Sequence, residues 1–271
     1  MYVKAKKSLG QHFLKDLGVA KRIVESLTST DLFDEIAKED PTSKVDVLEV
    51  GPGTGVLTQY LIVDPKIRLK VAEIDRESVE YLNIHYPSLG NDIWEGDFLR
   101  MDLADKFAGK FFIIGNFPYN ISSQIFFKVL DYKDNIPMAV GMIQKEVAER
   151  LASAPGKKCY GILSVLLQAW YDIEYLFTVD EHVFSPPPKV KSAVIRIKRN
   201  SRVSLGCDEA LFKSVIKTSF NQRRKAIRNS IKPLMGGNIL PDHFLLGQRP
   251  EQLSVEEFVE LTKMIDSSIN K

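Results

Sequence analysis

The sequence predicts an α/β protein with a mostly parallel sheet, followed by a small all-helical C-terminal domain. Short apolar runs typical of buried strands alternate with segments of helical periodicity from Val45 onward. A glycine-rich turn, Gly51 to Gly55, follows the first of these runs, as in βαβ units. After Ser201 the remaining pattern is helical. We therefore expect one domain over residues 1–200 and a second, smaller domain over residues 201–271.

Each expected strand is a short run rich in β-branched or aromatic residues, and each expected helix repeats its apolar residues every three or four positions. The expected strands are Val45–Val50, Leu69–Ile74, a segment ending near Trp94, Phe111–Ile114, Met138–Met142, Asp172–Val179 and Val190–Lys198. The expected helices are Leu17–Leu27, Val56–Leu61, Arg76–Tyr81, Ser122–Leu130, Gln144–Leu151, Leu163–Trp170, Phe220–Lys232 and one that starts after Ser254. In the last of these, Ser254 and Glu257 form a capping box, and Phe258, Leu261 and Ile265 face the core.

Length and composition exclude several classes of protein. The chain has 271 residues, 44% of them hydrophobic and 27% charged, which is typical of a soluble protein of one or two domains. The basic N-terminal segment leads into no apolar stretch, and no apolar run approaches membrane-spanning length, so we expect a cytoplasmic protein with no membrane association. Cys159 and Cys207 have no partners at metal-ligand spacing, so we expect no metal site.

The net charge of +2 conceals a strong asymmetry along the chain. Residues 1–22 have a net charge of +5, residues 23–185 of −11, residues 186–232 of +11 and residues 233–271 of −3. An acidic body between two basic segments suggests that a polyanion is held at the mouth of a site, although a single basic residue is more often only part of a solvated surface.

The glycine turn at residues 51–55 predicts a nucleoside-binding site. Glycines let the backbone approach a ligand, and the following helix offers free N–H groups. A dinucleotide fingerprint would need glycine at position 56, where this chain has Val56. The G-x-G-x-G spacing suits a cofactor without a pyrophosphate, such as S-adenosylmethionine. Glu49, inside the preceding strand, needs a partner because an unpaired buried carboxylate is costly.

Acidic side chains lie at the end of the second expected strand and just after the third, at the same edge of the expected sheet. Glu73 lies 18 residues beyond Gly55, a spacing at which a carboxylate accepts from ribose hydroxyls in βαβ units. Asp75 could share that role, but we favour it as the N-cap of the next helix. Asp97, in the loop after the third strand, could accept from the amino group of a cofactor adenine, or could simply be a turn residue.

The segment Asn116-Phe117-Pro118-Tyr119 follows the fourth strand and suits recognition of an exocyclic amine such as adenine N6. This nitrogen is a poor nucleophile and has two N–H donors that need acceptors. Asn116 offers an amide oxygen, and a carbonyl beside Pro118 offers a second acceptor. Tyr119 offers a flat face for an unstacked base, worth about 1–3 kcal/mol. Taken alone, the four residues fit an ordinary turn equally well.

Further aromatic and basic residues lie outside these loops. Phe184, before the rigid Pro186–Pro188 run, could cover the other face of the target base or could pack in the core. The segment Phe220–Lys232, stopped by Pro233, has five basic residues and no acidic one from position 223 onward, which favours contacts with phosphates. The candidate RNA-binding residues, all basic, are Lys4, Lys6, Lys7, Lys189, Lys191, Arg223, Arg224, Lys225 and Arg228.

Six segments in this order resemble the small-subunit ribosomal RNA adenine dimethyltransferases, and the resemblance spans most of the chain. The segments are S-L-G-Q-H-F-L (8–14), L-E-V-G-P-G-T-G (48–55), G-N-F-P-Y-N-I-S (115–122), Q-K-E-V-A-E-R (144–150), F-S-P-P-P-K-V-K-S-A-V (184–194) and F-N-Q-R-R-K (220–225). The resemblance implies a Rossmann-like class I methyltransferase fold with a seven-stranded sheet, and S-adenosylmethionine as cofactor. Residues 31–43 match none of these segments and read as an insertion without a catalytic role.

The resemblance also implies an activity and a set of site residues. The activity is dimethylation of N6 on two adjacent adenosines in the 3′-terminal hairpin loop of small-subunit ribosomal RNA, on an immature small subunit. The implied cofactor-binding residues are His12, Leu14, Gly51, Gly53, Glu73, Asp97 and Asn116. The implied catalytic residues, which hold the target adenine, are Asn116, Pro118, Tyr119 and Phe184. Position 12 is often Asn in this family, so a side-chain contact of His12 is the weakest of these expectations.

The expected mechanism is direct displacement of the methyl group by N6, without a covalent enzyme intermediate or a strong general base. Asn rather than Asp at position 116, and the lack of a catalytic His or Cys near it in the sequence, favour this mechanism. Two alternatives remain at this level. Similar turns occur in DNA-adenine and glutamine methyltransferases, and the protein could act mainly as a ribosome-assembly factor. Nothing in the sequence requires more than a monomer.

Overall fold

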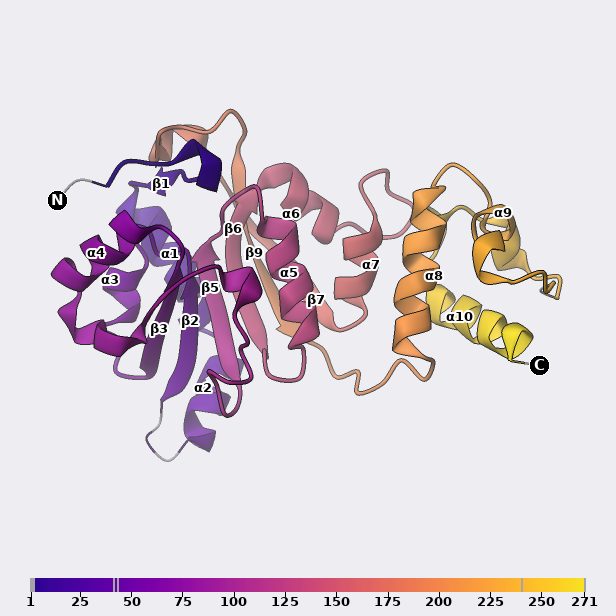
Figure 1. Ribbon diagram of the computed structural model, residues 1–271, viewed down its shortest axis with the longest axis horizontal. Helices are drawn as coiled ribbons and strands as arrows, with labels where there is room; N and C mark the ends of the chain where they lie inside the picture. Colours follow the sequence, from indigo (N-terminus) through magenta and orange to yellow (C-terminus); the bar gives the residue numbers. More distant parts are fainter. Residues whose placement is uncertain (1–2, 41, 43, 240, 271) are drawn as a thin grey trace. The chain divides into compact units, whose positions relative to one another are not determined.

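The computed structural model describes residues 3–40, 42, 44–239 and 241–270 (Figure 1). These residues form two compact units. The first comprises residues up to 148 together with 173–199, and the second comprises residues 149–172 together with those from 200 onward. The sequence placed residues 149–172 in the first domain, whereas the structure groups them with the C-terminal unit. Within that unit the Ser164 hydroxyl donates to the carbonyl of Arg150, and Gly156 N–H donates to the carbonyl of Glu251.

A seven-stranded sheet forms the centre of the first unit. Its strand order is β4-β3-β2-β5-β6-β9-β7. The pairs from β4 through β6 are parallel and β6–β9 is antiparallel, so the sheet is mostly parallel. The strands are β2 (Val45–Val50), β3 (Ile67–Glu73), β4 (Ile93–Glu95), β5 (Phe111–Asn116), β6 (Met138–Gln144), β7 (Tyr171–Val179) and β9 (Ser192–Arg199). The seven strands and the mostly parallel sheet expected from the sequence are confirmed.

The helices of the first unit bury one apolar face each. In α1, residues Ala20, Ile23, Val24 and Leu27 are buried, at the spacing seen in the sequence. The helices that lie wholly within this unit are α1 (Leu17–Thr28), α2 (Asp31–Glu39), α3 (Thr58–Leu61), α4 (Arg76–His85) and α5 (Ser122–Asp131). Helix α6 (Lys145–Leu151) begins directly after β6. The expected helix at 56–61 is thus shorter than predicted, because the glycine turn continues to Leu57 before helical bonding starts.

The segment that matched no family motif contains helix α2. Thr30 caps its N-terminus by accepting from Phe33 N–H, and Phe33, Ile36 and Ala37 are buried. The Phe33 ring lies 5.4 Å from the Phe112 ring of β5, so the helix packs on the sheet. Figure 1 shows α2 at the opposite end of the sheet from β1. Residues 41 and 43 of the predicted insertion lie outside the described residues.

A two-stranded antiparallel sheet joins segments that are about 170 residues apart in sequence. Strand β1 (Phe13–Leu14) pairs with β8 (Phe184–Ser185). Lys15 N–H donates to the carbonyl of Val183 at 2.8 Å and extends the pairing. Two of the segments singled out in the sequence, 8–14 and 184–194, are therefore neighbours in space.

The second unit is helical. Its helices are α7 (Ile162–Gln168), α8 (Glu209–Asn221), α9 (Ile227–Ser230) and α10 (Val255–Ile269). The capping box of Ser254 and Glu257 is present, and Phe258, Leu261 and Ile265 of α10 are fully buried. These expectations are confirmed.

The helix predicted over Phe220–Lys232 is wrong as a single element. Helix α8 ends at Asn221, a turn follows, and α9 covers only Ile227–Ser230. Ile227 N–H donates to the carbonyl of Gln248 at 2.8 Å, so a contact with a distant segment replaces the bond that would have continued the helix. Ile227 and Ile231 are buried as their spacing suggested, but the basic residues 223–225 lie in the turn.

Candidate active site

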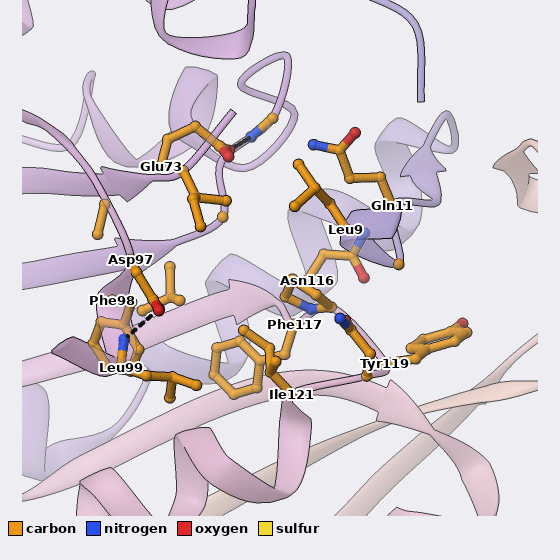
Figure 2. A pocket seen from close by; sticks show the side chains of 18 of the residues that line it. Leu9, Gln11, Glu73, Asp97, Phe98, Leu99, Asn116, Phe117, Tyr119 and Ile121 are labelled. Carbon is orange, nitrogen blue, oxygen red and sulfur yellow. Dashed lines mark hydrogen bonds between the residues drawn. The ribbon is translucent and has the colours of Figure 1, made fainter. Parts of the chain in front are cut away.

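A pocket lies where β2, β3, β4 and β5 end, at the edge where parallel sheets bind ligands (Figure 2). Five segments supply its walls: residues 9–13, 50–53, 72–74, 96–99 and 116–121. Figure 2 shows Glu73 and Asp97 at one end and Tyr119 at the other, with Asn116 between them. All of these residues belong to the first unit. The loops that the sequence indicated thus form one site.

The glycine turn brings backbone to the pocket wall. Gly51 and Gly53 have φ angles of 69° and 56°, in the left-handed region that glycine adopts without strain. A Cβ on Gly53 would lie 2.8 Å from the Phe13 ring, so the N-terminal segment packs directly against the turn. Any larger residue here would separate these two walls of the pocket.

Glu73 ends β3 with its carboxylate held by two backbone donors. Gly53 N–H donates to Oε2 at 3.0 Å, and Asp75 N–H donates to Oε1 at 2.9 Å. Burial raises the pKa of Glu73, and the two backbone hydrogen bonds act in the opposite direction. Each oxygen keeps a lone pair, so the carboxylate is oriented and can still accept from a ligand.

Asp75 is the N-cap of α4, as favoured from the sequence. Its Oδ1 accepts from Glu77 N–H at 3.3 Å, and its Oδ2 accepts from the Ser78 hydroxyl at 3.1 Å. Its carboxylate also pairs with Lys6 and accepts from the Gln11 amide. Asp75 therefore fixes the N-terminal segment on α4 rather than facing the pocket.

Glu49, in the strand that precedes the glycine turn, has a hydrogen-bond partner, as expected for a buried carboxyl group. The Thr58 hydroxyl donates to its Oε2 at 2.6 Å, and its side chain is 1% exposed. Burial raises the pKa of Glu49 to about 8, and the charge of Glu73 acts in the same direction.

Asp97 caps the short 3₁₀ turn Phe98–Arg100. Its Oδ1 accepts from Leu99 N–H at 2.9 Å, and its Oδ2 lies 3.5 Å from Arg100 Nε. The turn role suggested by the sequence is thus present, and Asp97 also lines the pocket. One carboxylate oxygen is thus fixed by the backbone and the other lies near Arg100, and about a third of the Asp97 side chain is exposed.

Asn116 is oriented by the N-terminal segment. Its Nδ2 donates to the backbone carbonyl of His12 at 3.0 Å. Because this hydrogen bond uses the amide nitrogen, Oδ1 remains available to accept a hydrogen bond from a ligand. The carbonyl of Pro118 accepts from Ile121 N–H at 3.2 Å and retains a second lone pair. Two acceptors for an amine are therefore present on one loop.

Tyr119 is fixed at its hydroxyl and leaves its ring at the pocket. The hydroxyl makes a short hydrogen bond with Ser192, which is fully buried on β9. Burial raises the pKa of Tyr119, so the phenol is neutral near pH 7. The ring lies 5.3 Å from the imidazole of His12.

His12, which the resemblance implied as a cofactor-binding residue, lies beside Asn116. His12 is distant in sequence, and the β1–β8 pairing brings it to the pocket. Its Nδ1 lies 2.8 Å from the carbonyl oxygen of Pro186. Because that oxygen can only accept, Nδ1 is the donor.

Phe117 is a core residue, which explains two of the glycines around it. It is 1% exposed, and its N–H donates to the carbonyl of Met142. A Cβ on Gly141 would lie 2.3 Å from the Phe117 ring, and one on Gly115 would lie 2.7 Å from it. These glycines make room for the ring that anchors the turn.

Two predicted site residues lie apart from this pocket. Phe184 is 1% exposed and belongs to the apolar core of the first unit, which favours the core alternative weighed from the sequence. Leu14 is 4% exposed and borders a small separate cavity beneath the glycine turn, together with Asn116. The other predicted pocket residues, which do line it, are His12, Gly51, Gly53, Glu73, Asp97, Asn116, Pro118 and Tyr119.

The predicted RNA-binding residues divide into engaged and exposed groups. Lys6 pairs with Asp75 and Glu77, and Lys191 pairs with Asp180. Arg223 Nη2 donates to the carbonyl of Lys158, and Arg228 Nε donates to that of Leu246. The remaining residues have exposed side chains and no ion pair within the described parts of the chain: Lys4, Lys7, Lys189, Arg224 and Lys225.

Sequence reasoning missed several residues that line the pocket. Leu9, Phe98, Leu99 and Ile121 supply apolar surface to it. All of them lie within three residues of a position singled out in the sequence. Their proximity to those positions was the only available signal.

Within the described residues, no group of three or more His, Cys, Asp or Glu side chains is placed to bind a metal ion. No helix of the described chain is long and apolar enough to cross a membrane.

Comparison with solved structures defines the class of the protein. A dimethyladenosine transferase from Plasmodium falciparum superposes with a TM-score of 0.74, covers 94% of this chain and 98% of its own, and is 23% identical. The 23S rRNA methyltransferase ErmE superposes with a TM-score of 0.61, covers 94% and 99%, and is 25% identical. The fold is that of the class I methyltransferases.

The sequence comparisons narrow this class to one family. A protein from Parabacteroides distasonis named ribosomal RNA small subunit methyltransferase A is 60% identical over 99% of this chain and 97% of its own length. The model of the family described as ribosomal RNA adenine dimethylase matches residues 2–267. The chain belongs to this family, and the protein is therefore a methyltransferase that uses S-adenosylmethionine.

Proposed function

We propose that this protein transfers two methyl groups from S-adenosylmethionine to N6 of each of two adjacent adenosines in the 3′-terminal hairpin loop of small-subunit ribosomal RNA. The observation that carries the proposal is the orientation of Asn116. Its amide donor is engaged by the carbonyl of His12, so its oxygen is the end presented to an exocyclic amine. The description of the family and the name of the Parabacteroides relative support the ribosomal RNA substrate.

The residues that line the pocket are suited to the cofactor. The left-handed Gly51 and Gly53 let the ligand approach the backbone, and the oriented carboxylate of Glu73 is suited to two ribose hydroxyls. Asp97 lies at the same end of the pocket as Glu73 (Figure 2) and offers an acceptor to the amino group of the cofactor adenine. His12 and Asn116 border the same pocket, and Leu14 supports the glycine turn from below.

S-adenosylmethionine supplies an electrophilic methyl group on sulfur. The protein contributes orientation. Adenine N6 has its lone pair delocalised into the ring, and accepting both N–H bonds with Asn116 Oδ1 and the carbonyl of Pro118 favours a pyramidal nitrogen. The lone pair then points out of the ring plane. The nitrogen becomes positively charged only after methyl transfer and is then strongly acidic, so no strong base is required. Positioning accounts for most of the rate.

Tyr119 supplies the stacking face for the target adenine. Its hydroxyl is fixed by Ser192, so the ring is held in place before the base arrives. A rigid aromatic face loses little entropy on binding, and stacking contributes about 1–3 kcal/mol per base. Because Phe184 is in the core, we assign it a supporting role through its pairing with Leu14 rather than a stacking role.

The proposed substrate is an immature small subunit, and the protein is proposed to act on it in the cytoplasm as a monomer. The exposed cations on both units are suited to phosphate contacts: Lys4, Lys7, Lys189, Arg224 and Lys225. Engaged cations such as Lys6 and Arg223 hold the fold of these segments instead.

The test is transfer of labelled methyl groups to three substrates: small subunits that lack the modification, duplex DNA, and protein rich in glutamine. We expect label only in the small subunits, with two methyl groups on each of two neighbouring adenosines when the modified nucleotides are mapped. Label in DNA or protein, or at another nucleotide, would contradict the proposed substrate. Small subunits that already have the modification are the matched control and should accept no label.

A further inference from the structure

Helix α5 begins at Ser122, shortly after the N-F-P-Y turn. It also contacts the loop after β4, which forms the opposite wall of the pocket. Lys128, two turns into this helix, extends toward the loop that follows β4. Its Nζ donates to the carbonyl of Leu99 at 3.2 Å and makes a short hydrogen bond to the carbonyl of Met101. Its ammonium also lies 5.5 Å from the centre of the Phe98 ring. One side chain thus contacts three residues of this loop.

The contacts of Lys128 are made at the end of the turn that Asp97 caps. The carbonyls of Leu99 and Met101 lie where the 3₁₀ turn Phe98–Arg100 ends, and Asp97 accepts from Leu99 N–H at its start. Phe98 and Leu99 line the pocket beside Asp97. A change in the position of this turn therefore moves the carboxylate of Asp97.

Tyr132, one helical turn beyond Lys128, holds the next part of the same loop. Its hydroxyl donates to Asp102 Oδ1 at 2.9 Å and accepts from Leu103 N–H at 3.1 Å. The Lys128 ammonium lies 5.5 Å from the Tyr132 ring. Residues 98–103 are thus attached to α5 at several points.

A lysine at this place has a cost that its contacts must offset. Burial lowers the pKa of Lys128, while Asp102, Asp131 and Asp97 act in the opposite direction. An exposed lysine would avoid this cost. The side chain is held here by the carbonyls that it binds, and hydrogen bonds from a charged donor are about twice as strong as neutral ones.

We infer that Lys128 is a positioning residue for cofactor binding, which fixes the Asp97 loop at the correct distance from Asn116. Helix α5 has the amine-binding turn at its N-terminus and the Asp97 loop on its side, so it sets the separation of the two ends of the pocket. Lys128 touches neither the cofactor nor the target base in this scheme. The inference rests on the proposed role of Asp97 in binding the cofactor.

The test is the affinity of the purified protein for S-adenosylhomocysteine, measured by calorimetry, in Lys128→Met and Lys128→Arg. Methionine keeps the unbranched, apolar part of the side chain and removes the donors, so we expect the dissociation constant to rise about tenfold. Arginine keeps charged donors and should restore affinity to within about threefold of the wild type. Lys110→Met, at an exposed lysine that pairs with Glu39, is the matched control and should bind as the wild type does.

Steady-state kinetics on unmodified small subunits separate positioning from a general structural effect. We expect Lys128→Met to raise KM for S-adenosylmethionine in proportion to the loss of affinity, with kcat and KM for the subunit changed less than about twofold. Amide exchange should become faster at residues 98–103 and not elsewhere in the unit.

Two results would overturn the inference. One is an unchanged dissociation constant in Lys128→Met. The other is a loss of affinity that Lys128→Arg does not restore and that accompanies an equal loss of kcat. The binding measurement needs no RNA and is therefore independent of the substrate. If the protein binds S-adenosylhomocysteine but methylates another substrate, the proposed function is refuted, and the binding test of Lys128 remains valid.

Discussion

The pocket of the first unit and the basic turn of the second unit use polar groups in opposite ways. In the pocket, Glu73, Asp97 and Asn116 are each held by backbone partners, so their orientation is set before a ligand arrives. In the turn at residues 222–226, Arg224 and Lys225 extend into solvent. The pocket is suited to recognition by geometry, which depends on single atoms. The basic turn is suited to attraction by charge, which is graded and depends on salt.

The largest effect is expected at Asn116. Asn116→Ala removes one acceptor for N6 and should lower kcat about 10²- to 10³-fold, the usual loss for a positioned group that acts on the transition state. Binding of the small subunit should stay within about twofold, because phosphate contacts dominate it. Labelled-methyl transfer and filter binding measure the two quantities. Asn83→Ala removes an amide on α4 and is the matched control, and wild-type turnover in Asn116→Ala would refute the geometric account.

The next prediction compares the contribution of the Tyr119 ring with that of its hydroxyl. Tyr119→Ala removes the stacking surface and should lower kcat/KM about 10- to 100-fold. Tyr119→Phe keeps the ring and loses the bond to Ser192, so we expect activity within about fivefold and a loss of about 1 kcal/mol in the free energy of unfolding. Single-turnover kinetics and urea unfolding measure these changes. Equal losses in the two variants would show that the hydroxyl, and not the ring, is what matters.

A smaller and salt-dependent effect is expected in the basic turn. The double variant Arg224→Gln, Lys225→Gln should raise KM for the small subunit about tenfold, and should reduce the slope of log KM against log salt by about 1–2. Its kcat and its affinity for S-adenosylhomocysteine should not change. Lys213→Gln, Lys217→Gln removes two exposed charges of α8 in the same unit. This α8 double variant is the matched control and should bind the small subunit as the wild type does. If it raises KM as much as the variant of the turn does, the loss of net charge explains the effect, and the location of the charges in the turn does not.

The smallest effect concerns Glu49 below the glycine turn. Burial raises its pKa to about 8, whereas in the unfolded chain a glutamate ionises near pH 4.3, so the folded state binds this proton more tightly. Its contribution to stability is complete below about pH 4.3 and is lost as the pH rises toward 8. Glu49→Gln cannot ionise and should be about 1–2 kcal/mol more stable relative to the wild type at pH 8 than at pH 6.5. Urea unfolding at both pH values measures this difference.

The exposed Glu95 of β4 offers a control for that measurement. Glu95→Gln makes the same chemical change at a solvated position and should keep the wild-type pH dependence. A Glu49→Gln variant that does the same would show that Glu49 is ionised in the folded protein.

Much of the pocket could be predicted because its residues follow strands. Glu73 and Asn116 end strands, and the glycine turn and Asp97 lie just beyond the ends of strands. Short apolar runs identify these strands, and parallel strands bring their ends to one edge. The capping box at Ser254 is equally local. These features depend on neighbours in the sequence, which a single chain shows.

Features set by distant contacts could not be predicted in this way. The 220–232 segment has helical periodicity, but the bond from Ile227 N–H to Gln248 breaks the helix. His12 reaches Tyr119, and Phe184 enters the core, through a strand pairing that no local pattern encodes. Lys6 looked like a phosphate ligand by composition, yet Asp75 and Glu77 engage it. In each case a partner far along the chain decided the role.

The pairing of β1 with β8 has a consequence for the synthesis of the protein. A growing chain that has reached residue 150 already contains the glycine turn, Glu73, Asp97 and the N-F-P-Y turn. Strand β1 has no partner until residues 183–186 leave the ribosome, and His12, whose carbonyl orients Asn116, is bonded to Pro186. The enzyme therefore acquires its complete catalytic geometry only in the last third of its translation.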